Sequence, residues 1–227
     1  MSLDLRTPLL GVVVPAHDEE ALLPGCLAAL ADAARHPALA RQVIEVVVVA
    51  DACTDATAAL AAAAGVTVLE LDAACVGAAR RAGAALLVER GAWWLASTDA
   101  DSTVGPGWLA AQLRLADAGA DAVCGAVDVV DWSEHPPGVR TRFAASYQRR
   151  DGHAHVHGAN LGVRTSAYVR AGGWSAVAAH EDVALVEELR LSGAQIAWSA
   201  APEVRTSGRR DPRCSGGFGD HLLALGA

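Results

Sequence analysis

An apolar run that ends in two carboxylates constrains this chain most. Residues 93–97 have the length and composition of a buried β-strand, and Asp99 and Asp101 follow with one residue between them. Side chains at positions i and i+2 of an extended segment point the same way, so both carboxylates can address one hard divalent cation. Ligands bind at the carboxyl ends of strands in open α/β sheets. The pattern therefore predicts a cation site, with a solvated Asp-x-Asp turn as the structural alternative.

Two earlier segments share this organisation, in which a strand ends in polar residues. Residues 9–14 and 44–49 are rich in valine, and each is followed by apolar side chains at helical spacing. Pro15 and an acidic loop follow the first strand, and Asp51 follows the second, where its carboxylate can accept a hydrogen bond from a nucleotide. The acidic loop lacks the glycine-rich turn of dinucleotide-binding folds, which argues against a dehydrogenase.

A third strand–helix unit precedes the acidic pair. Residues 66–71 predict a strand, and residues 76–90 predict a helix whose small side chains permit close approach to a sheet. Arg80 on this helix can reach a phosphate or a base. Successive strand–helix units predict a parallel, doubly wound sheet whose loops converge on one edge. The fold class is therefore α/β, with a mostly parallel central sheet flanked by helices.

The second half of the chain offers two further clusters. His153, His155 and His157 would share one face of an extended segment, which resembles a set of metal ligands; a polar cleft wall is the alternative. Near the C-terminus, Arg209 and Arg210 stand in a glycine-containing stretch. Guanidinium groups bind phosphate oxygens bidentately, so this stretch is a candidate loop over a diphosphate, or else a solvated basic tail.

Composition excludes several classes of function. The net charge of −8 argues against a general nucleic-acid binder, and the absence of lysine removes lysine-dependent mechanisms. The five cysteines show no disulfide or zinc pattern, so we expect reduced thiols. Residues 1–8 lack the features of a signal peptide, and no apolar run reaches the about 20 residues of a membrane span. We therefore expect a cytoplasmic protein without a transmembrane segment.

Four segments of the first half carry a family resemblance: VVVPAHDEE (12–20), ADACTDAT (50–57), VGAARRAG (76–83) and TDADS (98–102). Together they resemble a family 2 glycosyltransferase with the GT-A fold, in an alanine- and arginine-rich form similar to actinobacterial members. The resemblance implies a nucleoside-diphosphate sugar as the donor, with donor contacts at Pro15, His17, Glu19, Asp51, Arg80 and Asp99. It also implies Mg²⁺ or Mn²⁺ on the donor diphosphate, held by Asp99 and Asp101, with Asp101 as the stronger ligand.

Two positions depart from the pattern that the family usually shows. Residues 50–53 read Ala-Asp-Ala-Cys where the family often has Asp-Asp-Gly-Ser, and His17 stands where the family more often has asparagine. The first departure implies that one acidic contact to the donor is missing.

Three segments of the second half continue the family order: HGANLG (157–162), AGGW (171–174) and HEDVAL (180–185). The resemblance implies that these segments line the acceptor pocket, with acceptor contacts at Gly158, Asn160 and Trp174; a position in the core is the alternative for Trp174. An inverting transferase needs a carboxylate that takes the proton of the acceptor hydroxyl. The resemblance assigns this catalytic role to Asp182, beside Glu181; N-capping of the following helix is the alternative for Asp182. Arg209 and Arg210 are expected on the donor diphosphate.

The sequence thus predicts one GT-A-like domain over residues 1–227, with a nucleotide-sugar-binding half at about 1–103 and an acceptor-binding half at about 104–227. The predicted activity is metal-dependent transfer of a sugar from a UDP- or GDP-sugar to a hydroxyl acceptor, with inversion. Three alternatives stay open: a nucleotidyltransferase, a retaining enzyme resembling glucosyl-3-phosphoglycerate synthase, and a non-catalytic module that binds nucleotide sugars. The base, the sugar, the acceptor and the oligomeric state are not predicted.

Overall fold

The computed structural model describes residues 7–213 and 216–226, so the predictions for residues 1–6 and for Cys214 lie outside the described residues. The strands are β1 (Leu9–Ala16), β2 (Val43–Asp51), β3 (Thr67–Leu71), β4 (Ala92–Ser97), β5 (Ser102–Val104), β6 (Ala122–Val129), β7 (Leu161–Arg164) and β8 (Ile196–Thr206). The α-helices are α1 (Leu23–Ala34), α2 (Thr57–Ala63), α3 (Val76–Glu89), α4 (Trp108–Asp117), α5 (Val139–Ser146), α6 (Thr165–Arg170), α7 (Glu181–Leu191) and α8 (Phe218–Ala224). Short 3₁₀ helices span Pro37–Leu39 and Gly158–Asn160.

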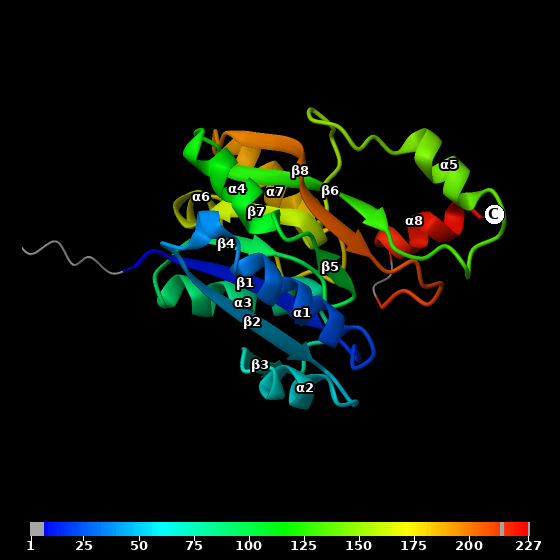
Figure 1. The fold of residues 1–227 in the computed structure, drawn as a ribbon, viewed down its shortest axis with the longest axis horizontal. Helices are drawn as coiled ribbons and strands as arrows, with labels where there is room; N and C mark the ends of the chain where they lie inside the picture. The colour runs from blue at the N-terminus through cyan, green and yellow to red at the C-terminus, as the bar shows by residue number, and fades with distance from the viewer. Residues whose placement is uncertain (1–6, 214–215, 227) are drawn as a thin grey trace, which may run out of the picture.

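The strands form one eight-stranded sheet in the order β3-β2-β1-β4-β7-β6-β8-β5 (Figure 1). β1 pairs in parallel with β2 and β4, and β2 pairs in parallel with β3, which confirms the predicted strand–helix units. β1 extends beyond the prediction, through Pro15 to Ala16. Proline has no N–H group to donate to a neighbouring strand. Pro15 is tolerated in β1 because the pairing of β1 with β4 ends at Val13, before the proline.

The second half completes the sheet with a mixed arrangement. β7 is antiparallel to β4 and to β6, whereas β8 is parallel to β6 and antiparallel to β5. The pairing of β6 with β8 shifts register between Gly125 and Val127. β7 is thus the element that reverses direction and connects the parallel half to the rest of the sheet.

Helices cover both faces of the sheet, and each face has its own core. On one face, α1 and α4 pack Leu23 and Trp108 against strand residues that include Val12. On the other face, α3, α6 and α7 contribute a second cluster, in which Leu87 accompanies Val13. Val12 and Val13 are neighbours and serve opposite cores because successive side chains of a strand alternate between faces.

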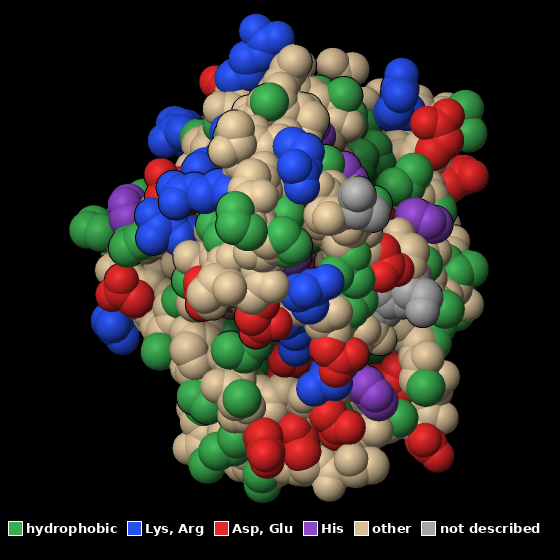
Figure 2. All heavy atoms as spheres, turned by 90° about the vertical axis from the view of Figure 1, so that its right-hand side faces the viewer, with side chains coloured by type: hydrophobic (Ala, Val, Ile, Leu, Met, Phe, Trp, Pro, Cys, Tyr) green, Lys and Arg blue, Asp and Glu red, His purple; other side chains and the backbone are tan. Residues whose placement is uncertain are grey.

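The carboxyl ends of several strands share one side of the molecule. Figure 1 shows the arrowheads of β2, β6 and β8 pointing toward the side where α5, α8 and the C-terminus lie, and β1 runs parallel to β2. There α5 and α8 form a small third core with β6, made of Phe143, Leu222 and Val129. Seen from this side, acidic side chains gather in the lower half of the surface and arginines in its upper left (Figure 2).

Composition led us to expect reduced cysteines and no transmembrane segment. Cys26, Cys53, Cys75 and Cys124 are free thiols. Within residues 7–213 and 216–226, no helix combines the length and the apolar character that a membrane crossing requires.

Candidate active site

A cavity of about 850 Å³ lies at the carboxyl ends of β1, β2 and β4, and residues from both halves of the chain line it. The predicted site residues along its wall are Pro15, His17, Glu19, Asp51, Arg80, Asp99, Asp101, Gly158, Glu181, Asp182 and Arg209. Asn160, Trp174 and Arg210 are not among the lining residues. The fold therefore brings most of the predicted donor-side and acceptor-side residues to one space.

Asp99 and Asp101 lie in a turn, not in the extended segment that their spacing predicted. The Ser102 N–H donates to the Asp99 carbonyl at 3.1 Å, because the chain must reverse here for β5 to pair with β8. Both carboxylates still line the cavity, but their partners differ. Asp99 Oδ1 accepts from Arg80 Nη2 at 2.5 Å. Asp101 Oδ1 accepts from the hydroxyl groups of Ser102 and Thr206 at 3.1 and 3.3 Å.

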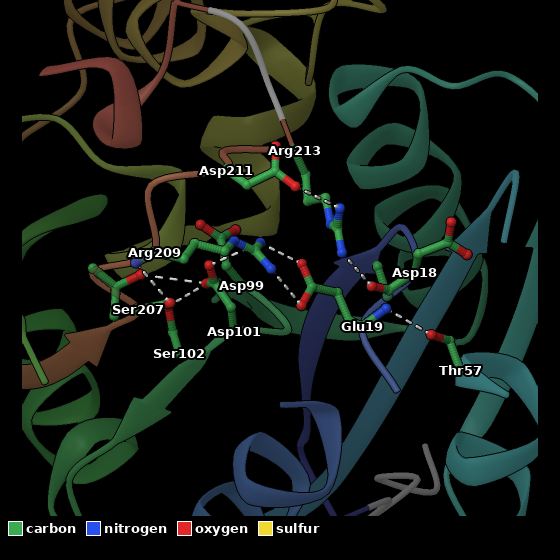
Figure 3. A network of polar contacts seen from close by, with 12 residues as sticks. Asp18, Glu19, Thr57, Asp99, Asp101, Ser102, Ser207, Arg209, Asp211 and Arg213 are labelled. Carbon is green, nitrogen blue, oxygen red and sulfur yellow. Dashed lines mark hydrogen bonds and ion pairs between the residues drawn. The ribbon is translucent and has the colours of Figure 1, made fainter. Parts of the chain in front are cut away.

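Arg209 places its guanidinium between acidic residues of two loops (Figure 3). Its Nη1 donates to Glu19 Oε2 at 3.0 Å, and its Nη2 pairs with Glu19 Oε1 and lies 3.1 Å from Asp101 Oδ2. Arg213, in the same segment, donates to the carbonyl of Asp18 at 3.3 Å. The chain that follows β8 therefore returns to the loop after β1 and contacts Asp101 of the acidic pair.

Asp101, Asp99 and Glu19 form a carboxylate cluster that suits a hard cation. Burial and the neighbouring Asp99 raise the pKa of Asp101 to about 6, although Arg209 acts in the opposite direction. A carboxylate that is withdrawn from water and close to other carboxylates is stabilised by a positive charge beside it. Arg209 provides that charge in the structure, and carboxylate oxygens are the ligands that Mg²⁺ and Mn²⁺ prefer. The residues present therefore fit a divalent cation.

A second acidic group, Asp18, Cys53 and Asp55, brings possible metal ligands within 4.8 Å of one another. Its carboxylates already hold the two loops together. Asp18 Oδ1 accepts from the Thr54 N–H at 2.7 Å and from the Asp55 N–H at 3.2 Å. Asp55 Oδ1 accepts from the Thr57 N–H at 2.9 Å. The hydrogen bond from Thr54 is the main cause that lowers the pKa of Asp18. This group does not line the cavity, and we assign it to loop structure.

Asp51 is buried at the end of β2, where its carboxylate accepts hydrogen bonds from the backbone. Its oxygens accept N–H groups of Ala73, Ala74 and Cys75, at 2.7, 3.0 and 2.7 Å. The Asp51 carbonyl pairs with His17 Nδ1 at 2.8 Å. Asp51 thus joins β2 to the loop that precedes α3. A nucleotide contact through this carboxylate must share oxygens with those N–H groups.

Glu181 and Asp182 begin α7 and reach the cavity from the second half of the chain. His180 precedes them as the N-cap residue with a φ of 60°, a left-handed conformation that turns the chain into the helix. The alternative of N-capping by Asp182 is therefore wrong. Asp182 stands inside the first turn, where its Oδ1 accepts the N–H of Val183 at 2.8 Å and its Oδ2 accepts the N–H of Gly158 at 2.8 Å. Glu181 pairs with Arg80; burial raises the pKa of Glu181, and Arg80 opposes that effect.

Asn160 lies in the core, outside the cavity. Its Nδ2 donates to the carbonyls of Ala126 and Pro202 at 2.7 and 2.9 Å, and its Oδ1 accepts from Trp108 Nε1 at 2.9 Å. A Cβ at Gly125 would lie 2.2 Å from this amide nitrogen, so glycine is needed there. Asn160 therefore connects β6, α4 and β8, and the structure does not place it for a direct acceptor contact.

Trp174 and Arg210 also lie away from the cavity wall. The Trp174 side chain is buried, and Arg80 Cζ lies 5.3 Å from the centroid of its ring. Arg210 is exposed, and its backbone N–H donates to Glu134 Oε2 at 3.2 Å. Of the two adjacent arginines, only Arg209 faces the carboxylate cluster.

His153, His155 and His157 stack in a row, so their rings do not converge on one metal position. The centroids of successive rings lie 5.3 and 6.1 Å apart, with interplanar angles of 22° and 26°. His155 Nε2 accepts from the Gln148 N–H at 3.1 Å, and the Tyr147 hydroxyl pairs with His157 Nε2 at 2.7 Å. Burial is the main cause that lowers the pKa of His157 to about 3. His155 and His157 line the cavity, as the alternative of a polar cleft wall predicted for this motif.

Aromatic residues of the second half extend this wall, and the sequence did not identify them. Tyr147 follows α5 and stacks on His155 with centroids 3.9 Å apart. Phe218 begins α8 and meets the His157 ring edge-on at 5.4 Å. Both line the cavity. Tyr147 and Phe218 lie in segments that have no clear periodic pattern in the sequence. Only the fold shows that these two rings contact the histidines.

The chain belongs to glycosyl transferase family 2, because the sequence profile of that family matches residues 11–171. A comparison with curated protein sequences finds no match. The family match covers the carboxylate cluster and the segment at Gly158, and it ends before Glu181 and Asp182.

Solved structures of S. aureus TarS are similar to this chain. TarS 1-349 in complex with UDP-GlcNAc has a TM-score of 0.69 and 16% identity, and the match covers 92% of this chain and 61% of that chain. The complex with UDP has a TM-score of 0.64 and 15% identity, covering 88% and 61%. TarS itself has a TM-score of 0.64 and 16% identity, covering 87% and 36%. The chain thus spans about three fifths of TarS 1-349. This likeness confirms the predicted GT-A fold.

Proposed function

We propose that the chain is a metal-dependent glycosyltransferase that moves a sugar from a nucleoside-diphosphate donor to a hydroxyl acceptor. One observation carries the proposal: the carboxylates of Asp99 and Asp101 line the same cavity as Asp182 from the other half of the chain. We assign donor binding to about residues 1–103 and acceptor binding to about residues 104–227. Membership of glycosyl transferase family 2 supports the reaction class.

The TarS structures bear on the choice of donor. They are complexes with UDP-GlcNAc and with UDP, which favours a UDP-sugar over a GDP-sugar as the first donor to test here. His17 and the loop before α3 lie at the edge of the cavity where we place the base and ribose.

We assign Mg²⁺ or Mn²⁺ to Asp101, with Asp99 and Glu19 beside it. A divalent cation in this cluster would offset the negative charge of the departing nucleoside diphosphate. Arg209 adds a guanidinium that matches the geometry of phosphate oxygens, and it already lies 3.1 Å from Asp101. We therefore place the diphosphate beside the carboxylate cluster, where its oxygens would replace Glu19 and Asp101 as the partners of Arg209.

Asp182 is our general base. The Gly158 N–H holds one of its carboxylate oxygens and the Val183 N–H holds the other, each at 2.8 Å, so the base is fixed in one orientation at the cavity wall. It takes the proton of the acceptor hydroxyl as that oxygen attacks the anomeric carbon. The bond between the sugar and the diphosphate breaks as the glycosidic bond forms. A single displacement of this kind inverts the configuration of the anomeric carbon.

Release of nucleoside diphosphate from UDP- and GDP-sugars tests the proposal. With Mn²⁺ we expect release by the wild type, and Asp101→Ala should lower its rate at least about a hundredfold, the size of effect seen when a charge-stabilising group is lost. Asp117→Ala changes an exposed aspartate of α4 and is the matched control, with unchanged release. Unchanged release by Asp101→Ala would refute the cation assignment. Nucleotide binding without any release would instead indicate a binding module.

A further inference from the structure

A buried arginine, Arg80, lies between the two sides of the cavity. It extends from α3, and only 2% of its surface is exposed. Its Nε donates to Glu181 Oε1 at 2.9 Å and its Nη2 donates to Asp99 Oδ1 at 2.5 Å. Its Nη1 donates to the Gly158 carbonyl at 3.1 Å and to the Ser97 hydroxyl. Every nitrogen of the guanidinium therefore has a protein acceptor, which leaves little of it for a donor phosphate.

The surroundings of this guanidinium suit arginine and not lysine. The Trp174 ring lies beside it, with 5.3 Å from Arg80 Cζ to the ring centroid. A Cβ at Gly158 would lie 2.5 Å from Arg80 Nη2, so glycine is needed for the close approach. The planar guanidinium donates in several fixed directions at once, which the single ammonium group of lysine cannot do. Gly158 and Trp174, predicted as acceptor contacts, thus serve to hold Arg80.

We propose that Arg80 is a positioning residue that couples Asp99 on the donor side to the general base Asp182. The path runs through the Gly158 residue, whose carbonyl accepts from Arg80 and whose N–H donates to Asp182 Oδ2 at 2.8 Å. Glu181 forms a second branch, since it pairs with Arg80 and directly precedes Asp182 in α7. This role deepens the proposed function and rests on it.

The coupling arises because one guanidinium shares its charge between two carboxylates. Where two acceptors compete for one cationic donor in a low-dielectric site, neutralising one acceptor strengthens the hydrogen bond to the other. Engagement of Asp99 in donor binding therefore tightens the bonds from Arg80 to Glu181 and to the Gly158 carbonyl, and this steadies Asp182. Conversely, loss of the Glu181 charge leaves Arg80 to neutralise Asp99 more fully, so the donor-side cluster binds a cation less tightly.

Glu181→Gln tests the coupling, because glutamine keeps the shape and can still accept from Arg80 Nε. We expect the affinity for UDP in the presence of Mn²⁺, measured by titration calorimetry, to fall at least about fivefold. In an Arg80→Lys background the same substitution should change the affinity less than about twofold, because lysine cannot form the bridge. Glu188→Gln alters an exposed glutamate of α7 and should leave the affinity unchanged in both backgrounds.

Each other outcome overturns this role. If Glu181→Gln binds UDP with an affinity within about twofold of the wild type, the two sides are not coupled, and the proposed function is unaffected. An equal fall in both backgrounds would assign the effect to the charge of Glu181 acting through space. A wild type that binds neither UDP nor GDP with Mn²⁺ would overturn the proposed function and this role together. Arg80→Gln replaces Arg80→Lys if the lysine variant does not fold, as judged by circular dichroism.

Discussion

At the scale of single residues, Asn160 shows that a residue of a binding motif can serve the core. The family order suggested an acceptor contact, but its side chain bonds to Trp108, Ala126 and Pro202 inside the protein. These partners lie 34 or more positions away in the chain, so no local pattern could reveal them. Asp182 differs, because it lines the cavity as the motif predicted.

Asn160→Ala should destabilise the fold by about 3 kcal/mol, because it leaves a buried indole N–H and two carbonyls without partners. Urea unfolding followed by fluorescence measures this loss. If Asn160 were instead an acceptor contact, the alanine variant would unfold at the same urea concentration as the wild type and lose only transfer activity.

His157 makes stability depend on pH in a defined direction. Burial, the main cause, lowers its pKa from 6.5 to about 3, so the unfolded chain binds the proton more readily than the native one. Its contribution to stability is therefore complete above the unfolded pKa and is lost as pH falls toward the native pKa. Between about pH 7 and pH 5 this residue should cost about 2 kcal/mol of unfolding free energy.

The matched variant for this prediction is His157→Asn, which cannot titrate but can still accept from the Tyr147 hydroxyl. We expect the wild type to be the more stable protein at pH 7 and its advantage to shrink by about 2 kcal/mol at pH 5. Urea unfolding at the two pH values gives both differences. An advantage that is the same at pH 5 as at pH 7 would show that His157 is protonated equally in the native and unfolded chains.

At the scale of elements, the first half was predictable, and so were α4, β6 and α7 of the second half, but β5, β7 and α5 were not. β1, β2 and β3 are apolar runs, each followed by a helix with regular spacing, and local pattern specifies such units. β7 has only 4 residues, and α5 buries only Val139 and Phe143, so neither has a readable period. β5 is a strand because it pairs with β8, which lies far away in the sequence. Such pairing depends on the assembled sheet and cannot be read from the local sequence.

The segment after β8 is the element whose placement most changes the site. The sequence identified an arginine pair for the diphosphate, but it could not tell which arginine turns inward. That choice depends on Glu19, which is 190 positions away and pairs with Arg209. Arg210 faces outward in the structure.

Arg209→Gln should therefore weaken UDP binding in the presence of Mn²⁺ by about tenfold, the effect of losing one charge-assisted contact to a phosphate. Arg210→Gln, one residue further along, should stay within about twofold of the wild type and serves as the control. Titration calorimetry on both variants decides the point. Equal losses in the two variants would show that the segment binds the diphosphate in a different conformation.

At the scale of the whole molecule, the sheet brings together residues that the sequence could only order along the chain. Parallel strands place Asp51 and the Asp99–Asp101 turn at the same edge, as predicted. The antiparallel β7 and the start of α7 then bring Gly158 and Asp182 to the other wall of one cavity. That Asp99 and Asp101 lie at this edge was predictable from the strand that precedes them, whereas the buried link through Arg80 depends on three-dimensional packing.

The proposed function requires this cavity to bind a nucleoside diphosphate through a cation held by Asp101. Thermal unfolding with UDP, GDP, CDP and dTDP, each with and without Mn²⁺, tests it most directly, because a ligand that binds only the native state stabilises it. We predict that UDP or GDP raises Tm by about 5 °C or more with Mn²⁺, and that Asp101→Ala loses this shift while Asp117→Ala keeps it. A wild type that none of these nucleotides stabilises, or one that is stabilised equally without Mn²⁺ and in Asp101→Ala, would contradict the claim.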